Sequence, residues 1–125
     1  MSAPSTVFDA AGGMPFFVAL VDRFYEGVAG DEVLRPLYPS DLEPSRRHLA
    51  LFLAQYWGGP PSYDEERGHP QLRLRHVPFA IGPLERDHWL VHMRAAVASL
   101  DPPPDLAAAL YEYFDIAAEA MRNRD

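Results

Sequence analysis

Gln55-Tyr56-Trp57-Gly58-Gly59-Pro60, then Arg67-Gly68-His69-Pro70, then Leu72-Arg73-Leu74-Arg75-His76 is the stretch that decides the fold. It predicts an apolar helix that stops at a Gly-Gly pair, a polar loop over residues 58–71, and a short segment ending on one histidine. His76 shares a face with Leu72 and Phe79, at i, i+4 and i+7 spacing. An imidazole on such an apolar segment can bind a metal ion, and it can equally be a core histidine with one hydrogen bond.

Apolar side chains recur at helical spacing on both sides of this stretch. They predict long helices over residues 15–28 and 45–57, a third that Pro83 opens and that reaches Leu100, and a fourth from near Asp105 to Met121. A short helix is expected around Val7 and Phe8, and a short segment from Asp31 to Pro39. No segment alternates with period two for long enough to predict a strand. The fold class is therefore all-α, with two pairs of helices and one irregular stretch between them.

The amino-acid composition excludes several classes of partner and of chemistry. The chain has 125 residues, the length of one domain over residues 1–125, and its net charge of −7 makes nucleic acid and anionic membranes poor partners. It contains no lysine, which excludes Schiff-base chemistry, and no cysteine, which excludes disulfides, zinc–thiolate sites and iron–sulfur clusters. Without an apolar run long enough for membrane insertion and without a signal peptide, a cytoplasmic location is expected.

The other histidines carry weaker signals. His88 and His92 stand at i, i+4 spacing, which can hold zinc, but the Glu of a His-Glu-x-x-His site and a third ligand are missing. His69 precedes a proline in the polar loop and is expected to be exposed, whereas His48 is expected at the edge of its helix.

Tyr25, Tyr38 and Trp89 each join an apolar body to a hydrogen-bond donor, and a buried donor needs a partner. Three such donors can converge on one small ligand, and they can also be ordinary core aromatics. No acid–base or nucleophile pattern competes with these residues, because Ser45 has no His–Asp partner in a recognisable arrangement.

The chain resembles the truncated haemoglobins, and within them the second group, also called the O type. The matching motifs span nearly the whole chain. They are Arg23-Phe24-Tyr25, Asp31-Glu32-Val33-Leu34-Arg35, Leu37-Tyr38-Pro39, the stretch from Phe52 to Pro60, Arg67-Gly68-His69-Pro70, Leu72-Arg73-Leu74-Arg75-His76, Glu85-Arg86-Asp87 with Trp89, and Ala95 to Ser99. The resemblance implies a two-over-two helical sandwich around haem b, which is held without covalent links because no cysteine is present.

The same resemblance implies roles for individual residues. His76 would be the proximal iron ligand, and Trp89, Tyr25 and Tyr38 would lie on the distal side, with Ser45 and Leu49 at distal positions of the second long helix. The implied contacts to the rest of the haem are Leu49, Phe52, Leu74, Phe79, Ile81 and Met93 along the porphyrin, and Arg75, Tyr63 and His48 near the propionates.

The implied function is binding of O2 and other diatomic ligands at a pentacoordinate iron, with bound O2 stabilised by the distal tryptophan and tyrosines. An alternative is a haem enzyme that uses O2 or peroxide, through nitric oxide dioxygenation or peroxidase-like oxidation, since the same residues serve both. The expected partners are O2, CO and NO, peroxide and a reductase for the redox alternative, and a homodimer is compatible with the resemblance. A third reading is a haem-free helical interaction module that binds zinc through His88 and His92.

Overall fold

The computed structural model describes residues 6–125, and helices account for all of the regular structure in that range. In chain order they are α1 (Val7–Ala11), α2 (Met14–Ala29), the 3₁₀ helix η1 (Arg35–Leu37), α3 (Glu43–Tyr56), α4 (Ser62–Arg67), α5 (Leu72–His76), α6 (Pro83–Ser99) and α7 (Pro104–Ala120). Pro15, Pro44, Pro83 and Pro104 each lie in the first turn of a long helix, where the missing N–H costs nothing. The all-α prediction is confirmed.

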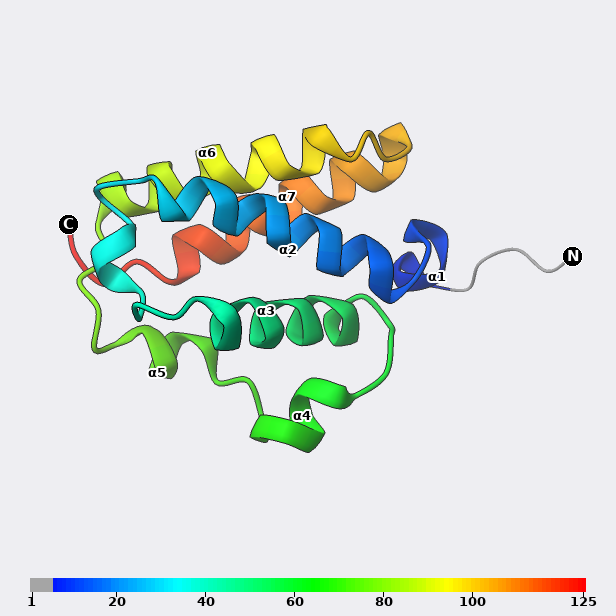
Figure 1. The fold of residues 1–125 in the computed structure, drawn as a ribbon, viewed down its shortest axis with the longest axis horizontal. Helices are drawn as coiled ribbons and strands as arrows, with labels where there is room; N and C mark the ends of the chain where they lie inside the picture. Colours follow the sequence, from blue (N-terminus) through cyan, green and yellow to red (C-terminus); the bar gives the residue numbers. More distant parts are fainter. Residues whose placement is uncertain (1–5) are drawn as a thin grey trace, which may run out of the picture.

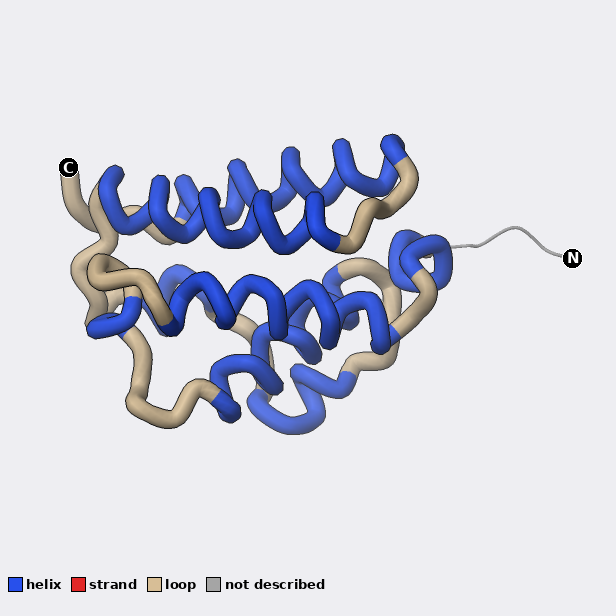
Figure 2. Tube along the Cα trace, turned by 45° about the horizontal axis from the view of Figure 1, so that its top comes forward, coloured by secondary structure: helices blue, strands red, loops and turns tan. Residues whose placement is uncertain are grey.

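The long helices form two stacked pairs. α2 packs on α3, α6 packs on α7, and α2 also packs on α6, so that one pair lies over the other (Figures 1 and 2). The core lies between the pairs, where Phe17, Leu20, Phe24 and Val28 of α2 are fully buried. Burial of each such side chain contributes on the order of 1.5–3 kcal/mol relative to exposure. The two-over-two arrangement is therefore confirmed.

Two details differ from the sequence-based expectations. Residues 58–71 are not a loop throughout, because α4 forms within them. Its first turn carries Asp64 and Glu65, where negative charge is favourable, and Tyr63 is buried with its ring 5.6 Å from that of Phe52. Tyr56 was expected on the buried face of the second long helix but is 54% exposed, with its ring 4.3 Å from that of Tyr113.

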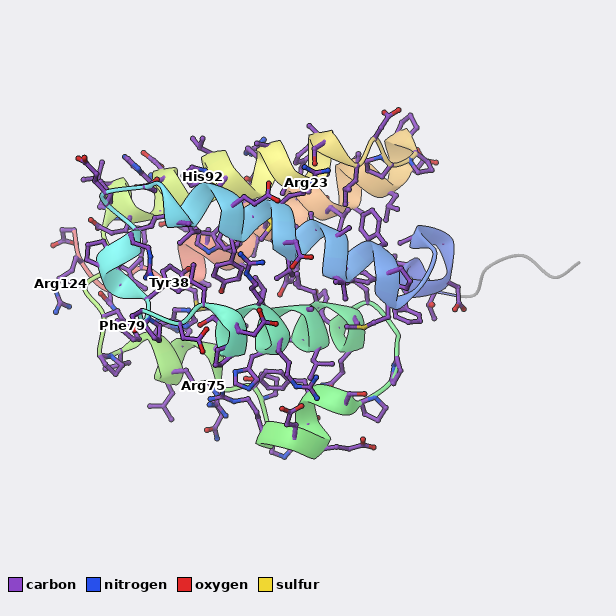
Figure 3. All side chains as sticks on the ribbon, in the orientation of Figure 1. Arg23, Tyr38, Arg75, Phe79, His92 and Arg124 are labelled. Atoms are coloured by element: carbon purple, nitrogen blue, oxygen red, sulfur yellow. The ribbon has the colours of Figure 1, made fainter. Side chains whose placement is uncertain are left out.

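α2 and α6 approach each other closely where Gly27 faces His92, and His92 lies between the two helices (Figure 3). A Cβ atom built on Gly27 would stand 2.3 Å from Nδ1 and 2.7 Å from Cγ of His92. Real side chains do not pack this tightly, so only glycine fits while the imidazole keeps its position.

We predict that Gly27→Ala destabilises the fold by about 1–3 kcal/mol, since the added methyl group must displace the ring of His92. Urea unfolding measures the change. Gly30→Ala is the matched control, because a Cβ atom on Gly30 meets nothing within 4 Å and the backbone there has a negative φ of −100°. Equal stability of the two variants would contradict the close packing of α2 against α6.

Candidate functional site

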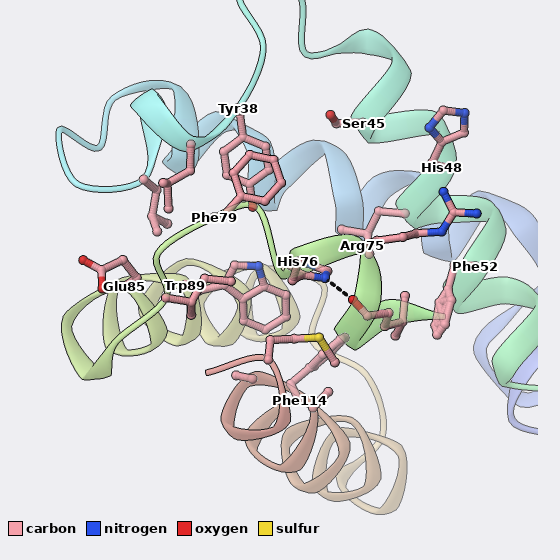
Figure 4. Close-up of a pocket in the computed structure, with 18 of the residues that line it drawn as sticks. Tyr38, Ser45, His48, Phe52, Arg75, His76, Phe79, Glu85, Trp89 and Phe114 are labelled. Carbon is pink, nitrogen blue, oxygen red and sulfur yellow. Dashed lines mark hydrogen bonds between the residues drawn. The ribbon is translucent and has the colours of Figure 1, made fainter. Parts of the chain in front are cut away.

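A cavity of about 410 Å³ is lined by residues of η1, α5 and the start of α6, together with residues of the other long helices (Figure 4). This volume is within the range of roughly 300–1,000 Å³ that small-molecule and cofactor pockets have. Twelve of the residues singled out from the sequence line the cavity: Tyr25, Tyr38, Ser45, His48, Leu49, Phe52, Tyr63, Arg75, His76, Phe79, Ile81 and Trp89. The cavity is thus the place where the predicted site residues come together.

Two of the expected porphyrin contacts do not line the cavity. Leu74 lies two residues from both Leu72 and His76 on α5, so it points outward and is 65% exposed. Met93 lies one helical turn beyond Trp89 on α6 and is fully buried in the core beside α2. The family resemblance had implied Leu74 as a porphyrin contact, although its spacing from Leu72 and His76 already indicates the opposite face of α5.

Other residues line the cavity although the sequence analysis gave them no role there. They are chiefly apolar residues from η1 and its flanks, α5 and α7: Leu34, Leu37, Leu72, Phe114 and Met121. Leu72 and Phe114 had a detectable signal, since both lie on apolar faces identified from spacing. Periodicity shows that such a face is buried, but it cannot show which part of the face meets a cavity.

His76 is held in a defined orientation at the end of α5. Its Nδ1 donates a hydrogen bond to the carbonyl oxygen of Leu72, one turn earlier, at 2.5 Å (Figure 4). A carbonyl can only accept, so Nδ1 carries a proton, and in the neutral imidazole the lone pair then lies on Nε2. The neutral form with an unprotonated Nε2 is the one that binds a metal.

α5 is tied down by its own arginine. Nε of Arg75 donates to the carbonyl of Pro70 at 2.7 Å, and Nη2 donates to the carbonyl of Arg67 at 3.1 Å. The residue before α5, Gln71, has a left-handed φ of 47°, which is unfavourable outside glycine. Arg75 therefore stabilises the turn into α5 while it also lines the cavity.

Tyr25, Tyr38 and Trp89 converge from α2, from the residue after η1, and from α6. The rings of Tyr25 and Tyr38 meet edge to face at 5.6 Å, and Trp89 packs between Phe24 at 5.1 Å and Phe114 at 5.7 Å. Burial raises the pKa of Tyr38 to about 12, an effect that the indole N–H of Trp89 partly offsets.

Burial also raises the pKa of Tyr25, and the neighbouring Tyr38 adds to the increase while the hydroxyl of Ser45 opposes it. Both tyrosines therefore stay protonated at neutral pH and can donate hydrogen bonds. The cavity thus combines the imidazole of His76 with three neutral donors.

Two arginines and one histidine lie where α3, α4 and α5 line the cavity. Nη1 of Arg67 donates to Nδ1 of His48 at 2.6 Å. Burial and the adjacent Arg67 lower the pKa of His48, so its imidazole is neutral and accepts this bond. Arg67, Arg75 and His48 all line the cavity and together form an edge suited to carboxylates.

The model of the bacterial-like globin family matches residues 6–123 of the chain. The group 2 truncated hemoglobin YjbI of Bacillus subtilis (strain 168) is 43% identical over 105 residues, which cover 84% of this chain and 80% of the relative. The chain belongs to the group II truncated haemoglobins.

Solved structures of bacterial haemoglobins superimpose closely on this chain. The hemoglobin of the thermophilic phototrophic bacterium Chloroflexus aurantiacus has a TM-score of 0.95 at 50% identity, over 97% of this chain and all of that one (100%). The truncated oxygen-avid haemoglobin of Bacillus subtilis has a TM-score of 0.91 at 39% identity, over 95% of this chain and 100% of that one. The fold of the truncated globins is thereby established for this chain.

Family membership supports haem-based binding of diatomic gases such as O2 for this truncated haemoglobin. Its cavity fits such a group, because an imidazole with a defined tautomer, apolar walls and a cationic edge meet in one place. None of the helices in residues 6–125 is long and apolar enough to span a membrane.

His88 and His92 of this truncated haemoglobin both form hydrogen bonds with the carboxylate of Asp31. Nδ1 of His88 and Nε2 of His92 donate to Oδ2 of Asp31 at 2.9 and 2.6 Å, while Oδ1 accepts from the amides of Val33 at 2.8 Å and Leu34 at 3.1 Å. Within the described part of the chain, no group of three or more His, Cys, Asp or Glu residues is arranged to hold a metal ion. The zinc reading of this pair finds no support in the structure.

The side chain of Asp31 is only 7% exposed. Burial alone would raise its pKa, but the hydrogen bonds from His88 and His92 and from the amides of Leu34 and Val33 outweigh burial and hold the pKa well below its usual range. Asp31 thus joins the chain leading to η1 with α6, through two histidines that do not line the cavity.

We predict that Asp31→Asn costs about 2 kcal/mol at neutral pH. The amide keeps Oδ1 for the two backbone N–H groups, but its NH₂ replaces the oxygen that accepts from both histidines. Asp115→Asn is the control, since its carboxylate pairs with Arg94 at the exposed surface, where such pairs contribute about 0–1 kcal/mol.

The cost should also depend on pH. Because the pKa of Asp31 is lowered on folding, its contribution is complete above the ordinary aspartate pKa of about 3.9 and is lost progressively as the pH falls from that value towards the lower pKa of the folded protein. The parent should therefore lose more stability than Asp31→Asn between about pH 6 and about pH 3 in chemical unfolding of the carbonmonoxy form. Parallel curves would show that Asp31 has no lowered pKa.

Proposed function

We propose that this chain is a single haem domain that holds haem b without covalent links through Nε2 of His76. The observation that carries the proposal is the hydrogen bond from Nδ1 of His76 to Leu72, which leaves Nε2 as the ligating nitrogen within the cavity. When bound, haem supplies an iron atom whose open coordination position takes up O2, CO and NO. The absence of cysteine is consistent with non-covalent attachment.

The other residues that line the cavity would contact either the apolar porphyrin or the charged carboxylates of the haem. Leu49, Phe52, Phe79 and Ile81 offer apolar surface along the cavity. The haem carboxylates would lie near His48, Tyr63 and Arg75, with Arg67 as an additional cation that the sequence analysis did not identify. A carboxylate beside His48 would favour protonation of its imidazole and so reverse the effect of Arg67.

Tyr25, Tyr38 and Trp89 would stabilise O2, which carries partial negative charge when bound. Donors in a water-poor cavity contribute more to such a ligand than the same donors in water. Of the three donors, Trp89 would contribute most to the ligand, because an indole N–H can only donate. The hydroxyls of Tyr25 and Tyr38 can instead form a hydrogen bond with each other. Ser45 and Leu49 complete this side of the cavity with one small and one apolar side chain.

We predict that His76→Ala loses most of its haem and unfolds at a lower temperature, since cofactor binding stabilises the folded state. The Soret absorbance per protein and a thermal scan measure the two effects. His69→Ala is the matched control, because His69 is exposed in the segment between α4 and α5, and this variant should keep haem fully. Full occupancy with an unchanged spectrum in His76→Ala would reject His76 as the ligand.

We predict that Trp89→Phe releases O2 roughly ten- to a hundred-fold faster than the parent, the result expected when a hydrogen bond of about 1.5–3 kcal/mol to a charged ligand is lost. Phenylalanine keeps the packing against Phe24 and Phe114 but removes the donor. Tyr38→Phe should give a smaller increase, since Tyr25 can replace it. Stopped-flow displacement of O2 by CO measures each rate, and a parent-like rate in Trp89→Phe would leave Trp89 as a steric wall only.

A further inference from the structure

The residues that follow α7 return to α5 and hold the end that carries His76. Figure 1 shows the chain after α7 beside the connection from α5 to α6, and Figure 3 places Arg124 at the same end of the molecule as Phe79. The backbone amides of Asn123 and Arg124 both donate to the carbonyl of Ile81, at 2.9 and 3.0 Å. This contact joins the last turn of the fold to the segment between His76 and α6.

The side chain of Asn123 makes three further hydrogen bonds in this segment. Its Nδ2 donates to the carbonyl of His76 at 3.2 Å and to the carbonyl of Phe79 at 2.8 Å. Its Oδ1 accepts from the amide of Ile81 at 2.9 Å. Both hydrogens of the amide and its oxygen are therefore used on three backbone groups of residues 76–81.

α5 needs these hydrogen bonds because it has little stability of its own. α5 has five residues and buries none of them, so it gains little from its own hydrogen bonds or from packing. Arg75 fixes the start of α5 through the carbonyls of Pro70 and Arg67, and Asn123 fixes its end. The carbonyl of His76 has no partner within α5. It accepts from the backbone N–H of Phe79 at 3.0 Å and from Nδ2 of Asn123, which reaches it from a distant part of the sequence.

We propose that Asn123 is a positioning residue for the haem ligand: by binding the carbonyls of His76 and Phe79 it sets the position and tilt of the His76 imidazole. The proposal rests on the proposed role of His76. Asn123 does not line the cavity, and it acts on the imidazole through the backbone of residue 76, because Leu72 holds the ring relative to that backbone. Loss of the clamp should therefore change the bond between His76 and iron as well as the retention of haem.

Two substitutions separate the parts of the clamp. Asn123→Ala removes all three side-chain bonds to residues 76–81. Asn123→Asp keeps the acceptor for Ile81, removes the donations to His76 and Phe79, and sets a carboxylate oxygen that repels both carbonyls in their place. Ser99→Ala is the matched control, since it removes another bond from a side chain to a carbonyl, from Oγ of Ser99 to Ala96 at 2.7 Å, at the end of α6 remote from α5.

Three readouts are compared for each variant. They are hydrogen exchange at the Ile81 amide, the iron–histidine stretching band of the ferrous deoxy form in resonance Raman spectra, and the rate of haem transfer to apomyoglobin. Asn123→Ala should raise Ile81 exchange, shift the band and release haem on the order of ten-fold faster. Asn123→Asp should shift the band while the Ile81 amide stays protected, and Ser99→Ala should change none of the three.

A stretching band that stays at the parent position in both Asn123 variants overturns the inference, even if haem is lost faster, because Asn123 would then only stabilise the fold. A second test uses His76→Gly with imidazole supplied from solution, where the ligand is no longer attached to the backbone. Asn123→Ala should not shift the iron–imidazole band there, and a shift as large as in the parent also overturns the inference. Full haem retention by His76→Gly without imidazole would instead overturn the proposed function, and this inference with it.

Discussion

The position of His76 depends on hydrogen bonds that reach α5 from outside it, because a helix of five residues has almost no stability of its own. Arg75 ties the start of α5 to the preceding turn, Leu72 fixes the imidazole, and Asn123 holds the final carbonyl. The rest of the cavity is lined by the long helices together with η1, α4 and the segment between α5 and α6. The geometry of the proposed site therefore rests on a few polar contacts to a segment that packing barely supports.

α6 serves two purposes through neighbouring residues. Successive side chains on a helix point about 100° apart, so Trp89 faces the cavity while His88 and His92 face Asp31. The carboxylate of Asp31 also caps the amides of Val33 and Leu34 just before η1. One ionic cluster thus fixes both α6 and the chain that leads to Tyr38, and these two elements supply donors to the cavity.

The sequence predicted the features that repeat with helical period and missed those that join distant residues. The long helices, the break at Gly58-Gly59 and the convergence of His76, Trp89 and both tyrosines followed from spacing and from the family resemblance. α4 was missed because a six-residue helix rich in charge has no apolar period to detect. The partner of His88 lies 57 residues away at Asp31, and the partner of the His76 carbonyl lies 47 residues away at Asn123. Nothing local in the sequence indicates either pairing, because each depends on how the helices stack.

The clamp of Asn123 on α5 also bears on the order in which the chain folds. A contact across 47 residues forms late, because closing so long a loop costs entropy before the contact can stabilise anything. α7 must dock on α6 before the residues behind it can reach the His76 carbonyl. We therefore expect the wall that carries His76 to become native only after α7 has docked, and a chain that meets its cofactor before that point would offer it a cavity with one side still open.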